Sequence, residues 1–226
     1  YPFSQTDMAL AINACFGLLT PPGAVTPEQQ ARLQLFLDET DLPARFILTD
    51  MGFSVFGLSD LIFDTRKLNG KQGMGNVGVQ YDNASIETTI ERVKTHPGGL
   101  NRHTKNYEPT GDVGNVKIVS THTSGDGLVI VEQQQVYRDL VPASNLTVAV
   151  VNEAPVETHC GYTVAELVAG WEALRGWVAG APQPTAASIQ ATCQGLVGAN
   201  IPGIDGPCRY DPAFVIENMD DRVPPR

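Results

Sequence analysis

Two short apolar runs, each rich in β-branched residues, constrain the fold of this chain more than any other feature. They span residues 116–122 and 146–151, and the segment 131–141 between them has the pattern of a helix. A second helix is predicted to begin at Thr163-Val-Ala-Glu166, because a Thr followed three residues later by a Glu is a capping box. The order strand, helix, strand, helix is typical of a parallel sheet. We therefore expect an α/β fold here.

The second predicted helix ends near Gly180, with an apolar face that comprises Leu167, Trp171, Leu174 and Trp177. Two strands are too few to form a stable covered sheet by themselves. The pattern therefore predicts part of a larger parallel sheet.

The rest of the chain shows no alternation typical of strands. Residues 1–110 contain short helical segments joined by Gly- and Pro-rich loops, and one helix is predicted to begin at Thr26-Pro27-Glu28-Gln29, with Thr as N-cap and Pro in the first turn. We expect residues 1–110 to form a helical cap or lid and residues 111–180 to form the α/β part. Residues 181–226, which contain Pro, Gly and two Cys, are expected to be an irregular C-terminal extension.

The charge of the chain argues against binding to nucleic acid, and its hydropathy argues against a membrane span. The chain has 25 acidic and 15 basic residues, a formal net charge of −10. Nucleic acid is not expected as a partner, because phosphate binding relies on basic patches. No apolar stretch approaches the roughly 18–20 residues that a membrane span requires. The first residue is Tyr1 rather than Met, which favours a processed product of a precursor.

The four cysteines predict one disulfide. Cys193 and Cys208 lie in a Gly- and Pro-rich region, and a bridge between them closes a loop of about 16 residues, which stabilises the fold by roughly 3 kcal/mol in the chain-entropy model. The alternative is a pair of buried free thiols. The pairing of Cys15 and Cys160 stays open. An even cysteine count is compatible with an oxidising compartment, so we expect a secreted or periplasmic protein.

Asp126 and His159 are the candidate catalytic residues. Asp126 is flanked by two glycines and follows the first predicted strand, and His159 follows the second. Catalytic groups gather at the carboxyl ends of strands in open α/β sheets, and a carboxylate that orients an imidazole makes two thirds of a Ser-His-Asp triad. The alternatives are a turn Asp that caps the helix that follows it and a His on a surface loop. His122, within or at the end of a strand, is interpreted as structural.

Other motifs carry less information. Gly73-Met-Gly75-Asn-Val-Gly78 has the spacing of a dinucleotide fingerprint, but no apolar strand precedes it and no long helix follows it. His96-Pro-Gly-Gly is interpreted as a break between segments rather than an oxyanion loop. The chain has no HExxH motif, CxxC pair or acidic calcium loop, so we expect neither a metal nor a cofactor.

A nucleophilic serine is not evident. The nucleophile elbow of α/β-hydrolases has the form G-x-S-x-G on a strand-to-helix turn. The segments around Ser54 and Ser59 each have the first glycine but lack the second, and neither follows a predicted strand.

Residues 115–180 resemble the C-terminal part of the α/β-hydrolase fold superfamily, especially secreted bacterial serine esterases and related peptidases. The segment Thr121-His-Thr-Ser-Gly-Asp126-Gly-Leu-Val is similar to the acid-bearing loop of that family. The segment Thr158-His159-Cys160-Gly161-Tyr162-Thr163 resembles its Gly-His-Cys-x-x-Thr histidine loop, with Thr158 in place of Gly. The resemblance covers about 65 residues.

The resemblance implies roles for these residues. Asp126 would orient His159, and His159 would be the general base toward a serine and then the general acid toward the leaving group. The serine and the oxyanion hole would lie on a missing N-terminal chain or segment of the same precursor, which would complete the sheet. We expect the larger chain of a two-chain serine hydrolase, inactive in isolation, that acts on a small ester or amide. Alternatives are a non-catalytic binding or structural subunit and an acyltransferase of the same fold.

The substrate class is suggested by the predicted cap. Its aromatic residues Phe53, Phe56 and Phe63 indicate a hydrophobic or aromatic substrate.

Overall fold

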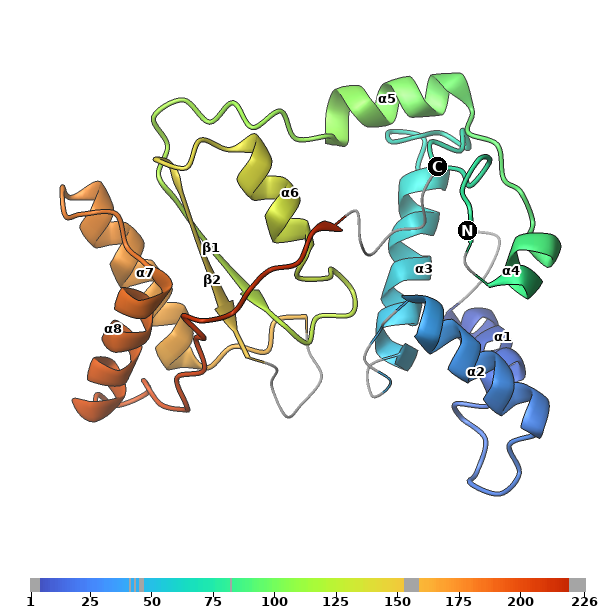
Figure 1. Ribbon diagram of the computed structural model, residues 1–226, viewed down its shortest axis with the longest axis horizontal. Helices are drawn as coiled ribbons and strands as arrows, with labels where there is room; N and C mark the ends of the chain where they lie inside the picture. Colours follow the sequence, from blue (N-terminus) through green and yellow to red (C-terminus); the bar gives the residue numbers. More distant parts are fainter. Residues whose placement is uncertain are drawn as a thin grey trace. The chain divides into compact units, whose positions relative to one another are not determined.

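The computed structural model describes residues 5–40, 42, 44, 47–81, 83–152 and 159–219 (Figure 1). The chain divides into two compact units, with the boundary between Pro109 and Thr110.

Over its described residues, the first unit consists of helices joined by turns and loops, without a strand. Its helices are α1 (Gln5–Phe16), α2 (Pro27–Thr40), α3 (Ile47–Phe63), α4 (Ala84–Thr89) and α5 (Pro97–Tyr107). Helix α2 begins at the predicted cap: Gln29 N donates to Thr26 Oγ1 at 3.2 Å, and Thr26 N donates to Gln29 Oε1 at 3.0 Å. Across the described ranges, no helix combines the length and the apolar character that crossing a bilayer requires.

The segment His96-Pro-Gly-Gly begins a helix, so its interpretation as a break is wrong. Gly98 N and Gly99 N donate to His96 Nδ1 at 3.0 and 3.4 Å, and Pro97 occupies the first turn of α5. Proline is favoured there because its missing N–H would have no partner within the helix. The imidazole nitrogen supplies the acceptor that Ser or Asp supplies in common caps.

The second unit has the predicted order of strands and helices. It contains β1 (Ile118–Thr123), α6 (Gln133–Leu140), β2 (Leu146–Val151), α7 (Val164–Val178) and α8 (Ala186–Gly198). The two strands pair in parallel, with Ile118 opposite Leu146 and Thr123 opposite Val151, so the predicted parallel pairing is confirmed. Over the described residues the sheet contains these two strands, and the larger sheet stays a prediction. Figure 1 shows the strands between α6 on one side and α7 with α8 on the other.

The core of this unit forms where small residues of α7 meet β2 and α8. The buried cluster comprises Ala149, Val151, Ala165, Ala169, Ile189, Cys193 and Tyr210. The predicted apolar face of α7 is therefore wrong in part. Leu167 is 54% exposed and Trp171 is 63% exposed, whereas Trp177 is buried. The alanine side of α7 is the side that packs, because small side chains let α8 approach closely.

Residues 181–226 are not simply irregular, since they include α8. The predicted disulfide is present: Cys193 on α8 is bonded to Cys208, with the Cα atoms 5.8 Å apart. Beyond it, Tyr210 forms an isolated antiparallel bridge with Val151 of β2. The disulfide and this bridge fix the segment after α8 against the core.

A glycine in this segment provides a sharp test of packing. Gly206 has φ +99°, and an added Cβ would lie 2.6 Å from Thr163 Cγ2, whereas Gly203 has φ +80° and open space around it. We expect Gly206→Ala to lower the free energy of unfolding by about 1–3 kcal/mol more than Gly203→Ala, since both incur the strain of a positive φ but only the first incurs overpacking. Urea unfolding followed by circular dichroism measures both. Equal losses would contradict the contact with Thr163.

Candidate active site

Asp126 and His159 meet in the second unit. His159 Nδ1 lies 2.6 Å from Asp126 Oδ2, although the two residues are 33 positions apart. Asp126 comes shortly after β1 and His159 follows β2. Because the strands are parallel, their carboxyl ends lie at the same edge of the sheet, and the residues beyond them can approach.

The two carboxylate oxygens of Asp126 have different partners. Its side chain is 2% exposed. Oδ1 accepts hydrogen bonds from Leu128 N at 3.0 Å and Val129 N at 2.9 Å, while Oδ2 accepts from His159. Asp126 therefore closes a turn and also contacts the imidazole, whereas the alternative that it caps the following helix is wrong, since the N-cap of α6 is Glu132. The turn fixes the direction in which Oδ2 points.

His159 is held at one nitrogen. Its Nδ1–H donates to the carboxylate, which leaves Nε2 as the unprotonated nitrogen of the neutral ring. The side chain is 48% exposed, and among the described residues no group hydrogen-bonds to Nε2. An imidazole oriented in this way can accept a proton at Nε2 while the carboxylate stabilises the resulting positive charge.

A second imidazole supports the Asp126 turn. His122 is buried, with Nδ1 3.0 Å from Gln134 Nε2 and Nε2 2.7 Å from Val129 O. Because Gln134 donates to Nδ1, the proton of the neutral ring lies on Nε2 and is donated to Val129 O. Nε2 is also 3.6 Å from Asp126 Oδ2. Ser120 Oγ in turn donates to Gln134 Oε1 at 2.9 Å. Sequence reasoning missed this contact between His122 and the turn.

Neither candidate elbow serine occupies an elbow. Ser54 and Ser59 both lie inside α3, away from any strand-to-helix turn of the described chain. No serine hydroxyl of the described residues hydrogen-bonds to His159. The Thr158 position of the histidine loop lies outside the described residues, and Cys15 and Cys160 are exposed free thiols.

Comparisons with known proteins identify no relative: no family model, no curated protein and no solved structure matches this chain. Within the described ranges, no three His, Cys, Asp or Glu side chains gather in a cluster suited to a metal ion. The candidate site is therefore characterised by its own geometry.

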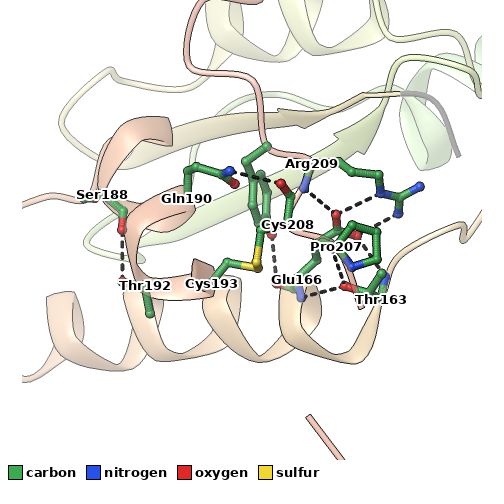
Figure 2. Close-up of a disulfide and its surroundings, with 10 residues drawn as sticks. Thr163, Glu166, Ser188, Gln190, Thr192, Cys193, Pro207, Cys208 and Arg209 are labelled. Atoms are coloured by element: carbon green, nitrogen blue, oxygen red, sulfur yellow. Dashed lines mark hydrogen bonds and ion pairs between the residues drawn. A yellow bond between two sulfur atoms is a disulfide. The ribbon is translucent and has the colours of Figure 1, made fainter. Parts of the chain in front are cut away.

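A buried ion pair lies beside the histidine loop and was not predicted (Figure 2). The Glu166 side chain is fully buried and pairs with Arg209, with Oε2 2.8 Å from Arg209 Nη2. Glu166 also completes the predicted capping box, since Thr163 N donates to it at 2.8 Å. Burial raises the pKa of the Glu166 carboxyl, but hydrogen bonds from Arg209 and from the backbone N–H groups of Thr163 and Arg209 outweigh burial. The pKa therefore lies below its ordinary value.

Proposed function

We propose that this chain is the acid–base part of a serine hydrolase whose nucleophilic serine and oxyanion hole lie on a second chain. The observation that carries the proposal is the 2.6 Å contact between His159 Nδ1 and the buried Asp126 carboxylate. A carboxylate that fixes the tautomer of a half-exposed imidazole is the arrangement that activates a serine hydroxyl.

The proposed reaction is acyl transfer to water in two steps. The serine Oγ attacks the carbonyl carbon while its proton passes to His159 Nε2, and the resulting imidazolium is stabilised by Asp126 through the Nδ1–H hydrogen bond. His159 then returns the proton to the leaving oxygen or nitrogen as the bond to the acyl carbon breaks. A water molecule repeats the sequence on the acyl-enzyme, which frees the acid and restores the serine. Asp126 stays ionised throughout.

The surface around β1 supports a second chain. Among the described residues β1 is hydrogen-bonded to one strand, β2, so its other edge has no strand neighbour there. A cavity of about 210 Å³ lies between β1 and α7, and Leu167 and Trp171 at that cavity are largely exposed. Open strand edges and exposed apolar patches are features of interaction sites. A chain that adds strands beside β1 would cover both.

A cavity in the first unit supports an apolar substrate group. It has a volume of about 480 Å³ and lies between α1 and α3, where Ile12, Phe53 and Phe56 contribute to its lining. This volume is within the range of about 300–1,000 Å³ found for small-molecule sites. Phe63 is exposed and is not among the lining residues. The proposed substrate is a small ester or amide with a hydrophobic or aromatic group.

The Cys193–Cys208 disulfide supports a secreted or periplasmic location.

Native mass spectrometry with an activity probe tests the proposal. The assembly is purified from its source, treated with a fluorophosphonate, and weighed before and after denaturation. We expect a second polypeptide that carries both the label and a G-x-S-x-G segment. A label on a serine of the present chain would contradict the two-chain arrangement, and a complete lack of labelling would contradict the hydrolase.

A further inference from the structure

The loop that carries His159 is tied to a distant segment of the chain by Arg209. Arg209 Nη2 donates to Gly161 O at 2.6 Å, two residues after His159. The same guanidinium holds Glu166, through Nη2 to Oε2 at 2.8 Å and Nε to Oε1 at 3.0 Å. Bidentate contacts of this kind fix the plane of a guanidinium. Arg209, in the segment after α8, therefore reaches the loop from a position fixed by Glu166 of α7.

The backbone of Arg209 is itself held from several sides. Arg209 N donates to Glu166 Oε1 at 2.8 Å, and Arg209 O accepts from Asn152 N, just beyond β2, at 2.9 Å. The preceding residue, Cys208, is bonded to the buried Cys193 of α8, and its carbonyl accepts from Gln190 Nε2 at 3.0 Å. Figure 2 shows the disulfide, Gln190, Glu166 and Arg209 within one cluster.

The remaining described contacts of the loop are few. Tyr162 OH donates to Thr121 O at 3.1 Å, and Tyr162 N donates to Cys160 O within the loop itself. His159 contributes the contact with Asp126. At the end of the loop Thr163 N donates to the Glu166 carboxylate, and Arg209 supplies the charged hydrogen bond to the loop backbone that lies nearer to His159. Charged hydrogen bonds are stronger than neutral ones.

We propose that Arg209 is a positioning residue for His159, and that the Cys193–Cys208 disulfide locks Arg209 in place. Contacts run from the disulfide to Arg209, from Arg209 to Gly161 O, and along the loop to the imidazole that faces Asp126. The catalytic consequence rests on the proposed function, because it needs His159 to act as a base. The placement of the imidazole ring does not rest on the proposed function, and it can be measured without an activity assay.

The tautomer of His159 reports whether its imidazole ring is held against Asp126. In the full chain, with ¹⁵N-labelled histidine and at a pH at which the ring is neutral, long-range ¹H–¹⁵N spectra give the ratio of the Nδ1–H to the Nε2–H form. His159→Ala assigns the signals. We expect Nδ1–H to dominate in the wild type. In Arg209→Lys this ratio should fall about tenfold or more, because that is the effect on an equilibrium of losing a hydrogen bond to a charged group, here the bond from His159 Nδ1–H to Asp126.

A matched control is available on α7, the helix that carries Glu166. Arg175→Gln breaks the exposed Arg175–Glu172 pair of α7 and is expected to leave the tautomer ratio unchanged. Arg209→Gln removes the positive charge as well as the guanidinium and should lower the ratio further. If Arg209→Gln does not fold, the result for Arg209→Lys alone tests the proposal. Reduction of the disulfide in the folded wild type, verified by circular dichroism, is expected to lower the ratio in the same direction.

Two results would overturn parts of the proposal. A folded Arg209→Lys variant with the wild-type tautomer ratio would refute Arg209 as a positioning residue. A folded, reduced chain with the wild-type ratio would refute the disulfide as a lock. Neither result depends on whether a partner chain is labelled by a fluorophosphonate, so the failure of this inference is distinguishable from the failure of the proposed function.

Discussion

Replacing His159 with Ala is expected to slow fluorophosphonate labelling and ester hydrolysis by the two-chain assembly by about 10⁴-fold or more, because the serine would lose the base that accepts its proton. The rates are measured on the reconstituted assembly, with folding verified by circular dichroism. His103→Ala serves as the control, because this imidazole lies on α5, next to Tyr107, and has no role in the proposed chemistry. Its rates are expected to equal those of the wild type.

Asp126→Asn probes the same contact from the other side. The amide oxygen of Asn can still accept from Leu128 N and Val129 N, so the turn is retained. The amide N–H₂ would then face His159 Nδ1, which would favour the wrong tautomer of the ring. We expect a loss of about 10⁴-fold in rate. Labelling at the wild-type rate in either His159→Ala or Asp126→Asn would refute the assigned roles.

Glu166→Gln is expected to lower the free energy of unfolding by about 3 kcal/mol or more at neutral pH, since removing one partner of a buried ion pair leaves the other charge uncompensated. Glu166 is fully buried, and Arg209 is 15% exposed at its side chain. Urea unfolding at pH 7 gives the difference. Glu172→Gln, which breaks the exposed pair with Arg175, is the control and is expected to cost about 1 kcal/mol or less.

The effect of Glu166→Gln should depend on pH. The folded-state pKa of Glu166 is lowered, whereas the unfolded chain has the ordinary value of about 4.3. The contribution of Glu166 to stability is therefore fully present above that unfolded value and is lost as the pH falls through the folded-state pKa. The gap between the wild type and Glu166→Gln should shrink below about pH 4. A gap that stays constant from pH 7 to pH 3 would contradict the charged pair.

Local signals predicted most of the elements of the second unit. The apolar run at 146–151 became β2 with the same bounds, and the capping box Thr163-Val-Ala-Glu166 began α7. Helix α8 was missed because its own box ends in Ser188 rather than Glu or Gln and its sequence contains two glycines. The cap at His96 was missed because an imidazole is an uncommon N-cap.

The buried face of α7 could not be predicted from the sequence. Leu167 and Trp171 have helical spacing, and a large apolar face is normally assigned to the core. In the structure the opposite face, with Ala165 and Ala169, is buried against α8 and the sheet. Periodicity identifies an apolar face, but the neighbour that covers it is set by segments far away in the chain.

By itself the sequence predicted the parallel pair of strands and the candidacy of Asp126 and His159, and it favoured the Cys193–Cys208 disulfide over a pair of free thiols. These follow from local pattern, since strands, caps and the residues after strand ends depend on neighbours within a few positions. Only the tertiary structure decided that the Asp126 carboxylate meets His159 Nδ1 and that Arg209 pairs with Glu166. Such pairs join residues 33 and 43 positions apart, and their distance depends on how the chain packs rather than on any local preference.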